Sequence, residues 1–375
     1  MTHSMTFDAI AEDLPGAKWR ARWDACWPEY RAWFEARGGA SGPSRQACEA
    51  ALAEHMPELV PVHRDLTRLA GGGDLAARFL STWCPPAYLG GCSLAALSDG
   101  DDTRLIRNYD LSPDLNEGFL LRSAWTGTPV MGMVEFLWGL SDGINEHGLS
   151  VALAFGGTER VGQGFGICTI LRYLLETCRD VPQALDVLDR VPSHMDYNLV
   201  LADAEGRVQS VEVHAGGGIV LRPGAVATNH QLDRPLPLKA EFTRTVERLA
   251  ALTRVTRKDE GDAAVAAFGR APLYQTDFAG GFGTLFTAEY RPGTRAMRLI
   301  WPDIEMAQSL HAFDETSVTV TFGDAPRTEV PLEDLVAFVP DSRRDRARRW
   351  LDEARAGRMD WAAFGALFVP DAARP

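Results

Sequence analysis

The feature that most constrains the fold of this chain is an abrupt change of pattern between residues 84 and 92. Before it, large apolar side chains recur at helical spacing; after it, short apolar runs alternate with polar residues and end at turns. The boundary itself reads CPPAYLGGC and holds two prolines and two glycines, which is typical of a linker. The sequence therefore predicts a helical N-terminal segment joined to a chain rich in strands.

The first 83 residues are expected to be helical. Residues Ala17–Ala36 carry tryptophan, tyrosine and phenylalanine at roughly helical spacing, and the glycines and proline of residues 38–43 end this helix. Ser44 is suited to cap a second helix that runs to about His55. A further helix is expected over Leu75–Trp83. We interpret the aromatic stripe as core packing rather than as a ligand cage.

Beyond the linker, strands dominate, and Cys92–Leu97 and Thr103–Asp110 are expected to form a hairpin around a turn at residues 98–102. Further strands are expected at residues 129–136, 149–155, 196–202, 208–214, 225–229, 284–290 and 296–301. Helices are expected at residues 167–179, 181–188, 238–252 and 259–268, with a charged surface helix at 342–358. Strands, then helices, then strands indicate an α+β fold with antiparallel sheets.

Charge and composition exclude several classes of function. The chain has 38 Lys and Arg against 51 Asp and Glu, a net charge of −13, which disfavours binding to nucleic acid or to an anionic membrane. No apolar run reaches the roughly 20 residues of a membrane helix, and the start shows no signal peptide. The six cysteines form no CxxC pair and no His/Asp/Glu cluster has ligand spacing, so we expect reduced thiols, no metal and a cytoplasmic protein.

Cys92 is the residue most able to carry chemistry. It opens a strand directly after Gly90-Gly91, and Gly91 lacks a Cβ, so its carbonyl is accessible. A Cys92 thiol could attack that carbonyl, take the acyl group onto sulfur and let water release a new chain. The new α-amine, with a reference pKa of about 7.7–8.0, could then act as general base. The alternative is a small buried core cysteine.

The expected hairpin brings charged residues towards Cys92. A turn centred near Gly100 places Cys92 opposite about Asn108, so Asp110 would face the same side and could accept a hydrogen bond from the α-amine. Arg107 has the opposite parity and would reach the thiol only through a bulge or an irregular strand end. There it would favour the thiolate.

Four motifs in order then resemble a known family. They are Gly-Cys-Ser at 91–93, Arg-Asn-Tyr-Asp at 107–110, Asn-Glu-His-Gly-Leu at 145–149 and Thr-Asn-His at 228–230. Over roughly residues 75–303 the chain is similar to the N-terminal-nucleophile (Ntn) hydrolases, and more narrowly to the acyl-coenzyme A:6-aminopenicillanic acid acyltransferase group (peptidase family C45), relatives of choloylglycine hydrolase. The resemblance implies a four-layer αββα sandwich and a zymogen that cuts itself before the cysteine.

Site residues follow from the same resemblance. It makes Cys92 the nucleophile and Arg107 and Asp110 the residues that position and tune it. Asn229 would donate to the oxyanion. Arg244 would match the arginine that closes the site in choloylglycine hydrolases, with Arg248 as the competing candidate.

One position departs from the bile-salt branch of that family. Where an asparagine is expected, this chain reads Ala-Phe-Gly-Gly at residues 154–157, so a backbone N–H of Phe155, Gly156 or Gly157 would complete the oxyanion hole. This departure disfavours a bile-salt substrate and favours the acyltransferase-like branch.

The resemblance implies a hydrolase or acyltransferase that acts on linear amide C–N bonds of small molecules through an S-acyl Cys92 intermediate. We expect three parts: a helical pro-segment over 1–91, retained as a subunit after cleavage at Gly91–Cys92, an Ntn-hydrolase domain over 92–340, and a helical extension over 341–375. We expect no required cofactor, although a coenzyme A thioester could donate the acyl group. The sequence leaves the oligomeric state open. The alternatives are an unprocessed binding protein with the same fold and a peptidase acting on short peptides.

Overall fold

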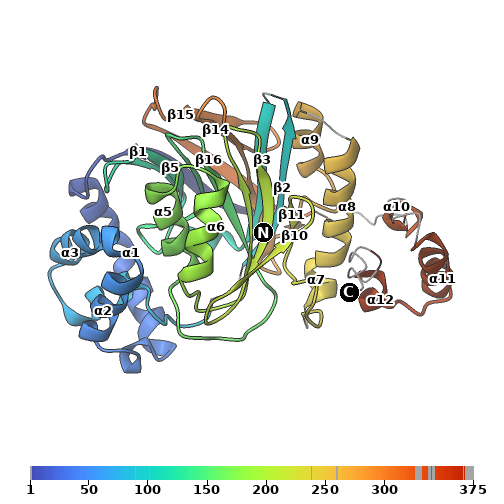
Figure 1. Ribbon diagram of the computed structural model, residues 1–375. Coiled ribbons are helices and arrows are strands. Elements are labelled where there is room, and N and C mark those ends of the chain that lie inside the picture. Colours follow the sequence, from blue (N-terminus) through green and yellow to red (C-terminus); the bar gives the residue numbers. More distant parts are fainter. Residues whose placement is uncertain are drawn as a thin grey trace.

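The computed structural model describes residues 2–88, 90–100, 102–237, 239–258, 261–325, 332–336, 339, 343–365 and 367. Two β-sheets lie face to face, and helices cover both outer faces (Figure 1). This arrangement is the four-layer αββα sandwich of the predicted α+β class, which is thereby confirmed.

The larger sheet has nine strands in the order β10-β9-β8-β7-β6-β5-β4-β1-β16. Neighbours pair antiparallel except β1 and β4, which are parallel. Its strands are β1 (Thr2–Ala11), β4 (Phe119–Ser123), β5 (Val130–Glu135), β6 (Gly139–Asn145), β7 (Ser150–Phe155), β8 (Tyr197–Ala202), β9 (Val208–Val213), β10 (Ile219–Arg222) and β16 (Thr316–Gly323).

The second sheet carries the cysteine-bearing hairpin, in the order β11-β2-β3-β13-β14-β15, with β12 paired to β13. Its strands are β2 (Gly91–Asp99), β3 (Asp102–Leu111), β11 (Val226–Ala227), β12 (Thr276–Asp277), β13 (Phe282–Arg291), β14 (Ala296–Ile300) and β15 (Glu305–Ser309). Apolar side chains of both sheets meet in one core between them, and Cys92 belongs to that core.

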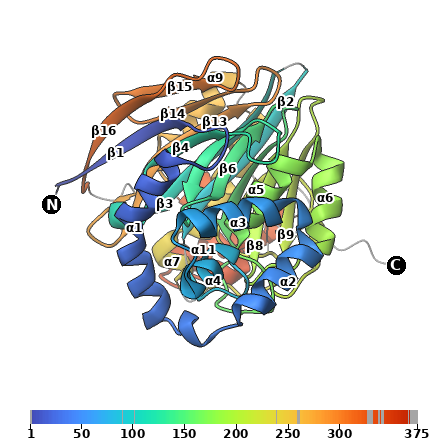
Figure 2. The same ribbon diagram turned by 90° about the vertical axis from the view of Figure 1, so that its left-hand side faces the viewer.

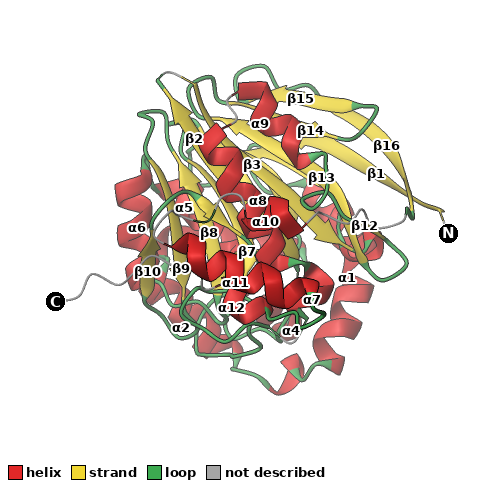
Figure 3. Ribbon diagram, turned by 90° about the vertical axis from the view of Figure 1, so that its right-hand side faces the viewer, coloured by secondary structure: helices red, strands yellow, loops and turns green. Residues whose placement is uncertain are grey.

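Helices complete the layers on both sides. Helix α5 (Ile167–Thr177) and helix α6 (Val181–Arg190) lie on the larger sheet, while α8 (Thr245–Lys258) and α9 (Gly261–Phe268) lie on the second (Figures 1 and 3). The N-terminal helices join the core beside α5, and Figure 2 shows them across that face. They are α1 (Ala17–Ala36), α2 (Arg45–His55), α3 (Val60–Leu69) and α4 (Asp74–Ser81).

The N-terminal segment differs from the all-helical expectation at its start. The helix predicted over Ala17–Ala36 is confirmed, and the Ser44 hydroxyl accepts the amide of Ala47 as the predicted cap. Residues Thr2–Ala11, however, form a strand between β4 and β16. That strand draws its hydrogen bonds from residues far along the chain, which a helical reading of the neighbouring sequence could not reveal.

A second difference lies in the helix predicted over residues 238–252. Arg244 adopts a left-handed conformation with φ 52°, so the segment divides into α7 (Ala240–Thr243) and α8. The predicted charged helix near the C-terminus is confirmed as α11 (Arg344–Arg355), which lies beside α10 (Leu332–Val336) and α12 (Trp361–Gly365) (Figure 3).

The expected domain limits stay predictions. The limit between residues 340 and 341 lies outside the described residues, and the division at residue 91 has no test in the fold. Among the helices that the structure describes, none is long and apolar enough to cross a membrane.

Candidate active site

The register of the β2–β3 hairpin decides which side chains face Cys92. Asp99 pairs with Asp102, and Cys92 therefore lies opposite Tyr109, one residue away from the predicted partner Asn108. The turn is tighter than the sequence suggested, and a one-residue slip moves each side chain to the other face of the sheet. Arg107 thus shares the face of Cys92 without any bulge, and Asp110, opposite Gly91, lies on the other face.

Arg107 is held against the thiol by buried acceptors. Its Nη2 lies 3.2 Å from Cys92 Sγ, while its Nη1 donates to Asp142 Oδ2 at 2.5 Å and to Ser141 Oγ at 2.9 Å. The Tyr109 ring lies 4.2 Å from the guanidinium carbon, close enough for a cation–π contact. Burial raises the pKa of Cys92 to about 11, and the charge of Arg107 opposes that rise.

Asn229 binds the backbone of Cys92. Its Oδ1 accepts the Cys92 N–H at 3.0 Å, and its Nδ2 donates to Phe155 O at 3.2 Å and to Gly90 O at 3.4 Å. Asn229 follows β11, which pairs with β2, so the sheet itself carries this amide to the start of β2. The sequence predicts that Asn229 donates to an oxyanion. In the uncut chain, its Nδ2 donates to these two carbonyl groups instead.

Arg248, rather than Arg244, reaches Cys92. Its Nη1 donates to Cys92 O at 2.5 Å, and its Nη2 donates to Asn229 Oδ1 at 2.7 Å. It also forms a buried ion pair with Asp110, whose Oδ1 accepts the Thr284 hydroxyl at 2.7 Å. Arg244 stands at the break between α7 and α8 and pairs with Glu247 instead.

Asp110 therefore acts on Cys92 indirectly, from the opposite face of the sheet. It holds Arg248, and Arg248 in turn holds the carbonyl of Cys92 and the amide of Asn229. Burial raises the pKa of Asp110, while Arg248 and the Thr284 hydroxyl oppose that rise. In this uncut structure Asp110 reaches Cys92 only through Arg248, and the predicted hydrogen bond from the α-amine to Asp110 stays a prediction.

The three backbone positions proposed for the oxyanion hole have different surroundings. The Gly156 amide donates to Asp196 O at 2.9 Å, so that donor is already used. Phe155 presents its carbonyl to Asn229. Gly157 has φ +88°, and a Cβ there would lie 2.5 Å from Asn229 O, so only glycine lets the two segments approach.

Gly91 is confined by its neighbours. A Cβ at this position would lie 2.2 Å from Cε2 of Phe282 and 3.0 Å from Asp110 O, whereas a Cβ at Gly90 would meet nothing within 4 Å. The bond before Cys92 is thus held in a tight slot against β13 and β3.

Two acidic residues near the thiol were not predicted from the sequence. Asp142 on β6 anchors Arg107 and also accepts the Tyr290 hydroxyl at 2.5 Å. Glu135 at the end of β5 accepts the Tyr109 hydroxyl. The signal that was available for Asp142 is a carboxylate between Leu140 and Ile144, just before the Asn-Glu-His-Gly turn.

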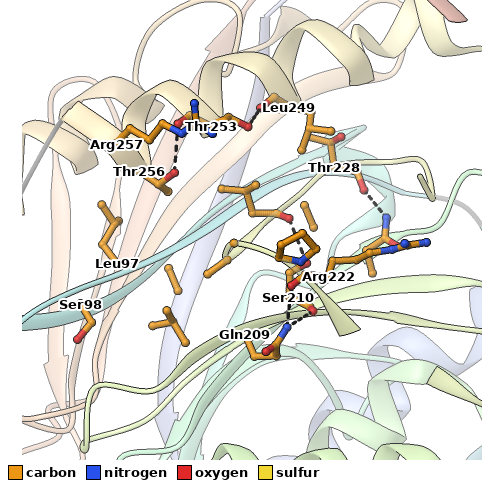
Figure 4. A pocket seen from close by; sticks show the side chains of 18 of the residues that line it. Leu97, Ser98, Gln209, Ser210, Arg222, Thr228, Leu249, Thr253, Thr256 and Arg257 are labelled. Atoms are coloured by element: carbon orange, nitrogen blue, oxygen red, sulfur yellow. Dashed lines mark hydrogen bonds between the residues drawn. The ribbon is translucent and has the colours of Figure 1, made fainter. Parts of the chain in front are cut away.

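A cavity of about 1010 Å³ (Figure 4) lies beside Cys92 and its partners and does not include Cys92. Helix α8 lines one side with Leu249, Thr253, Thr256 and Arg257, and strand β9 lines another with Gln209 and Ser210. Neither Cys92 nor Arg107 lines it. Cys92 itself is only 1% exposed, so the approach to the thiol is closed in the uncut chain.

Several solved structures resemble the chain. Penicillin V acylase from Agrobacterium tumefaciens is 15% identical with a TM-score of 0.41, over 59% of this chain and 86% of that one. A mutant of conjugated bile acid hydrolase from Clostridium perfringens is 12% identical with a TM-score of 0.42, over 64% and 100%. The N-acylethanolamine-hydrolyzing acid amidase ortholog of Caenorhabditis elegans is 14% identical with a TM-score of 0.42, over 61% and 99%.

Comparison at the level of sequence places the chain in a family. No curated protein matches it. The family model described as acyl-coenzyme A:6-aminopenicillanic acid acyl-transferase matches residues 97–305, more than half of the chain, beginning just after Cys92. The match confirms the resemblance inferred from the motifs: the chain belongs to the acyl-coenzyme A:6-aminopenicillanic acid acyl-transferase family.

Proposed function

We propose that the chain is a self-cleaving cysteine amidohydrolase or acyltransferase that carries the acyl group of a small-molecule amide on Cys92 Sγ. The observation that supports this most is the way Cys92 is held: its thiol by Arg107, its nitrogen by Asn229 and its carbonyl by Arg248. A buried structural cysteine needs partners for its backbone groups, but it does not need an arginine against its thiol. The family of the chain, whose description names an acyl-transferase, agrees with acyl-transfer chemistry at this thiol.

Self-cleavage comes first. The Cys92 sulfur bonds to the Gly91 carbonyl carbon and loses its proton; the C–N bond then breaks as the Cys92 nitrogen takes a proton. The product is a Gly91 thioester on Cys92 with a free α-amine; water then hydrolyses the thioester to a Gly91 carboxylate and the free Cys92 thiol. Asn229 Oδ1, which already accepts the Cys92 N–H, would hold that amine, and Arg107 stabilises the charge on sulfur.

Turnover then uses the new N-terminus. The α-amine takes the thiol proton, the thiolate attacks the substrate carbonyl, and the amine returns the proton to the leaving nitrogen. Water or an acceptor amine removes the acyl group from Cys92. Departure of Gly90 frees Asn229 Nδ2 from one of its two carbonyl partners, which leaves a donor for the oxyanion. A coenzyme A thioester would enter this cycle as an acyl donor at the same sulfur.

The N-terminal segment would remain bound after cleavage. Strand β1 pairs with β16 over eight residue pairs and with β4 on its other side, so residues 1–91 share a sheet with the rest of the chain. Tryptophans of α1 also lie in the core beside α5. We propose a two-chain enzyme in which the pro-segment persists as a subunit.

The test is a mass measurement on the acyl-enzyme. Cleaved protein, mixed with activated amides and quenched in acid, should gain the acyl mass on the fragment that begins at Cys92. Cys92→Ala should gain none, and Asn229→Ala should lose about 10²–10³ in turnover, the usual cost of one oxyanion donor. Cys26→Ala, a thiol on α1, serves as the matched control. Full turnover by purified Cys92→Ala would refute the proposal, and an uncut chain that only binds ligand would support a non-catalytic relative.

A further inference from the structure

The linker before the cut places an aromatic ring in a pocket of its own. Tyr88 lies 4.6 Å from Phe136, 5.1 Å from His194 and 6.2 Å from Tyr197, measured between ring centroids, and is stacked on His194. Cys168 lines the same space. We call Phe136, Cys168, His194 and Tyr197 the Tyr88 pocket. It shows that a planar ring of this size fits here.

Two series of contacts connect the Tyr88 pocket to Cys92. Phe136 follows Glu135, which accepts the hydroxyl of Tyr109, the residue opposite Cys92. Tyr197 pairs with Phe155, whose carbonyl holds Asn229. Because Tyr88 stands only four residues before Cys92, cutting at Gly91 frees the end of the segment that fills the pocket.

Glu135, next to Phe136 of the Tyr88 pocket, carries a carboxyl group that forms no ion pair with a described residue. The groups that act on Glu135 come from several elements: Arg107 and Tyr109 on β3, Asp142 on β6, Cys168 on α5, Glu117 before β4, and the hydroxyl groups of Tyr30, Tyr88 and Tyr197. The single cation among them, Arg107, is already paired with Asp142. Among the ion pairs of the described residues none includes Glu135, and burial raises its pKa to about 7.

A second acceptor lies in the same pocket. His194 is 1% exposed, its Nδ1 contacts Phe165 O at 3.2 Å, and its Nε2 has no hydrogen-bond partner among the residues that the structure describes. Burial lowers the pKa of His194 to about 4, so the ring is neutral and Nε2 can accept. Buried acceptors without donors are costly and mark a place where a ligand supplies the donor.

We infer that the Tyr88 pocket, once the linker has left, is the acyl subsite, and that it selects a planar acyl group bearing an ammonium or similar donor. This inference rests on the proposed function. Aromatic rings and a carboxylate together favour a cation, and Glu135 and His194 offer the two acceptors that such a group requires.

The test compares two p-nitroanilides of the same shape, 4-(aminomethyl)phenylacetyl and 4-ethylphenylacetyl, on the cleaved enzyme. We expect kcat/KM to favour the ammonium compound by about 10-fold to 100-fold, as a hydrogen bond to a charged group allows. Glu135→Gln should bring that ratio close to one, chiefly through KM. The ratio should also fall below about pH 7, where Glu135 becomes protonated. Glu58→Gln, at a carboxyl that likewise accepts a tyrosine hydroxyl, that of Tyr173, is the control.

The outcomes separate the inference from the proposed function. Equal kcat/KM for both compounds, or a preference that Glu135→Gln leaves intact, overturns the inference. If neither compound is turned over, binding of the two free acids is measured by calorimetry. A preference for the ammonium acid that depends on Glu135 supports the subsite while the proposed function fails; equal binding overturns both. If the chain stays uncut, the same binding is measured on Tyr88→Ala, which removes the ring from the pocket.

Discussion

Three atoms of Cys92 form hydrogen bonds with side chains, and each of these side chains comes from a different part of the chain. Arg107 from the paired strand holds the sulfur, Asn229 beyond β11 holds the nitrogen, and Arg248 on α8 holds the carbonyl oxygen. Burial keeps the thiol protonated at neutral pH, with a pKa of about 11, so the arginine beside it controls how much thiolate forms.

Replacing Arg107 with Gln should slow self-cleavage by about 10-fold to 100-fold, the loss expected for a hydrogen bond to a charged group. The pKa of Cys92 would rise further, so raising the pH should restore part of the rate. The half-life of the uncut chain after refolding, followed at several pH values, measures this. Arg104→Gln on the same strand is the control, because Arg104 binds Asp102, Asp262 and Glu289 instead. Equal rates for Arg107→Gln and the parent chain would show that Arg107 does not act on the thiol.

The slot around Gly91 gives a matched pair of substitutions. Gly91→Ala would place a methyl group 2.2 Å from the ring of Phe282, while Gly90→Ala meets open space. We expect Gly91→Ala to lose about 1–3 kcal/mol of stability, as overpacked sites do, and to block cleavage. Gly90→Ala should cleave normally. Urea unfolding and the cleaved fraction on a denaturing gel report both effects, and normal cleavage of Gly91→Ala would contradict the assigned geometry.

At the scale of elements, local patterns predicted part of the molecule, and strands β4, β6, β10, β12, β15 and β16 were not predicted. The helix over residues 17–36, the Ser44 cap and the Cys92 hairpin follow from periodicity and turn residues, and the structure confirms them. The register of that hairpin depended on whether its turn spans two residues or three, which the sequence around Gly100 left open. The choice between Arg244 and Arg248 depended on a helix break that only packing reveals.

Strand β1 escaped prediction because its partners lie more than a hundred residues away. Its anchor is Phe7, which is 1% exposed and lies 4.9 Å from Trp301 and 5.9 Å from Phe286 between ring centroids. Strands of mixed polarity carry little local signal, so their place in a sheet is set by tertiary pairing.

Phe7→Ala should therefore loosen the N-terminal segment. Truncating a buried phenylalanine costs about 3–5 kcal/mol, and here the loss falls on the contact that keeps residues 1–91 bound after cleavage. We expect a lower urea midpoint and, in cleaved protein, loss of the small fragment on native size-exclusion chromatography. Leu14→Ala, at a residue that is 68% exposed, should leave both unchanged. Full retention of the fragment in Phe7→Ala would show that β1 does not hold it.

For the whole molecule, buried histidines make stability sensitive to acid. Burial lowers the pKa values of His194 and His230 to about 4, against an ordinary value of 6.5. Between pH 6.5 and 4 the unfolded chain binds more protons at these sites, so stability falls as pH falls, by up to about 1.4 kcal/mol per pH unit for each histidine. Glu135 has the opposite effect on stability between about pH 4.5 and pH 7. Because burial raises its pKa to about 7, the folded chain binds more protons there than the unfolded chain, and stability rises as the pH falls.

Substituting His194 with Gln should thus flatten the acid side of the stability profile. The free energy of unfolding from urea titrations at pH 4.5, 5.5 and 6.5 measures the slope. The parent chain should lose more stability per pH unit than His194→Gln does. Identical slopes would mean that His194 is protonated in the folded protein as readily as in the unfolded chain.

The central claim is that Cys92 becomes an N-terminal nucleophile, and the intact mass of the denatured protein tests it most directly. We expect two fragments, of 91 and 284 residues, in the parent chain and a single chain in Cys92→Ala. A single uncut mass in both proteins, after prolonged incubation at neutral pH, would contradict it.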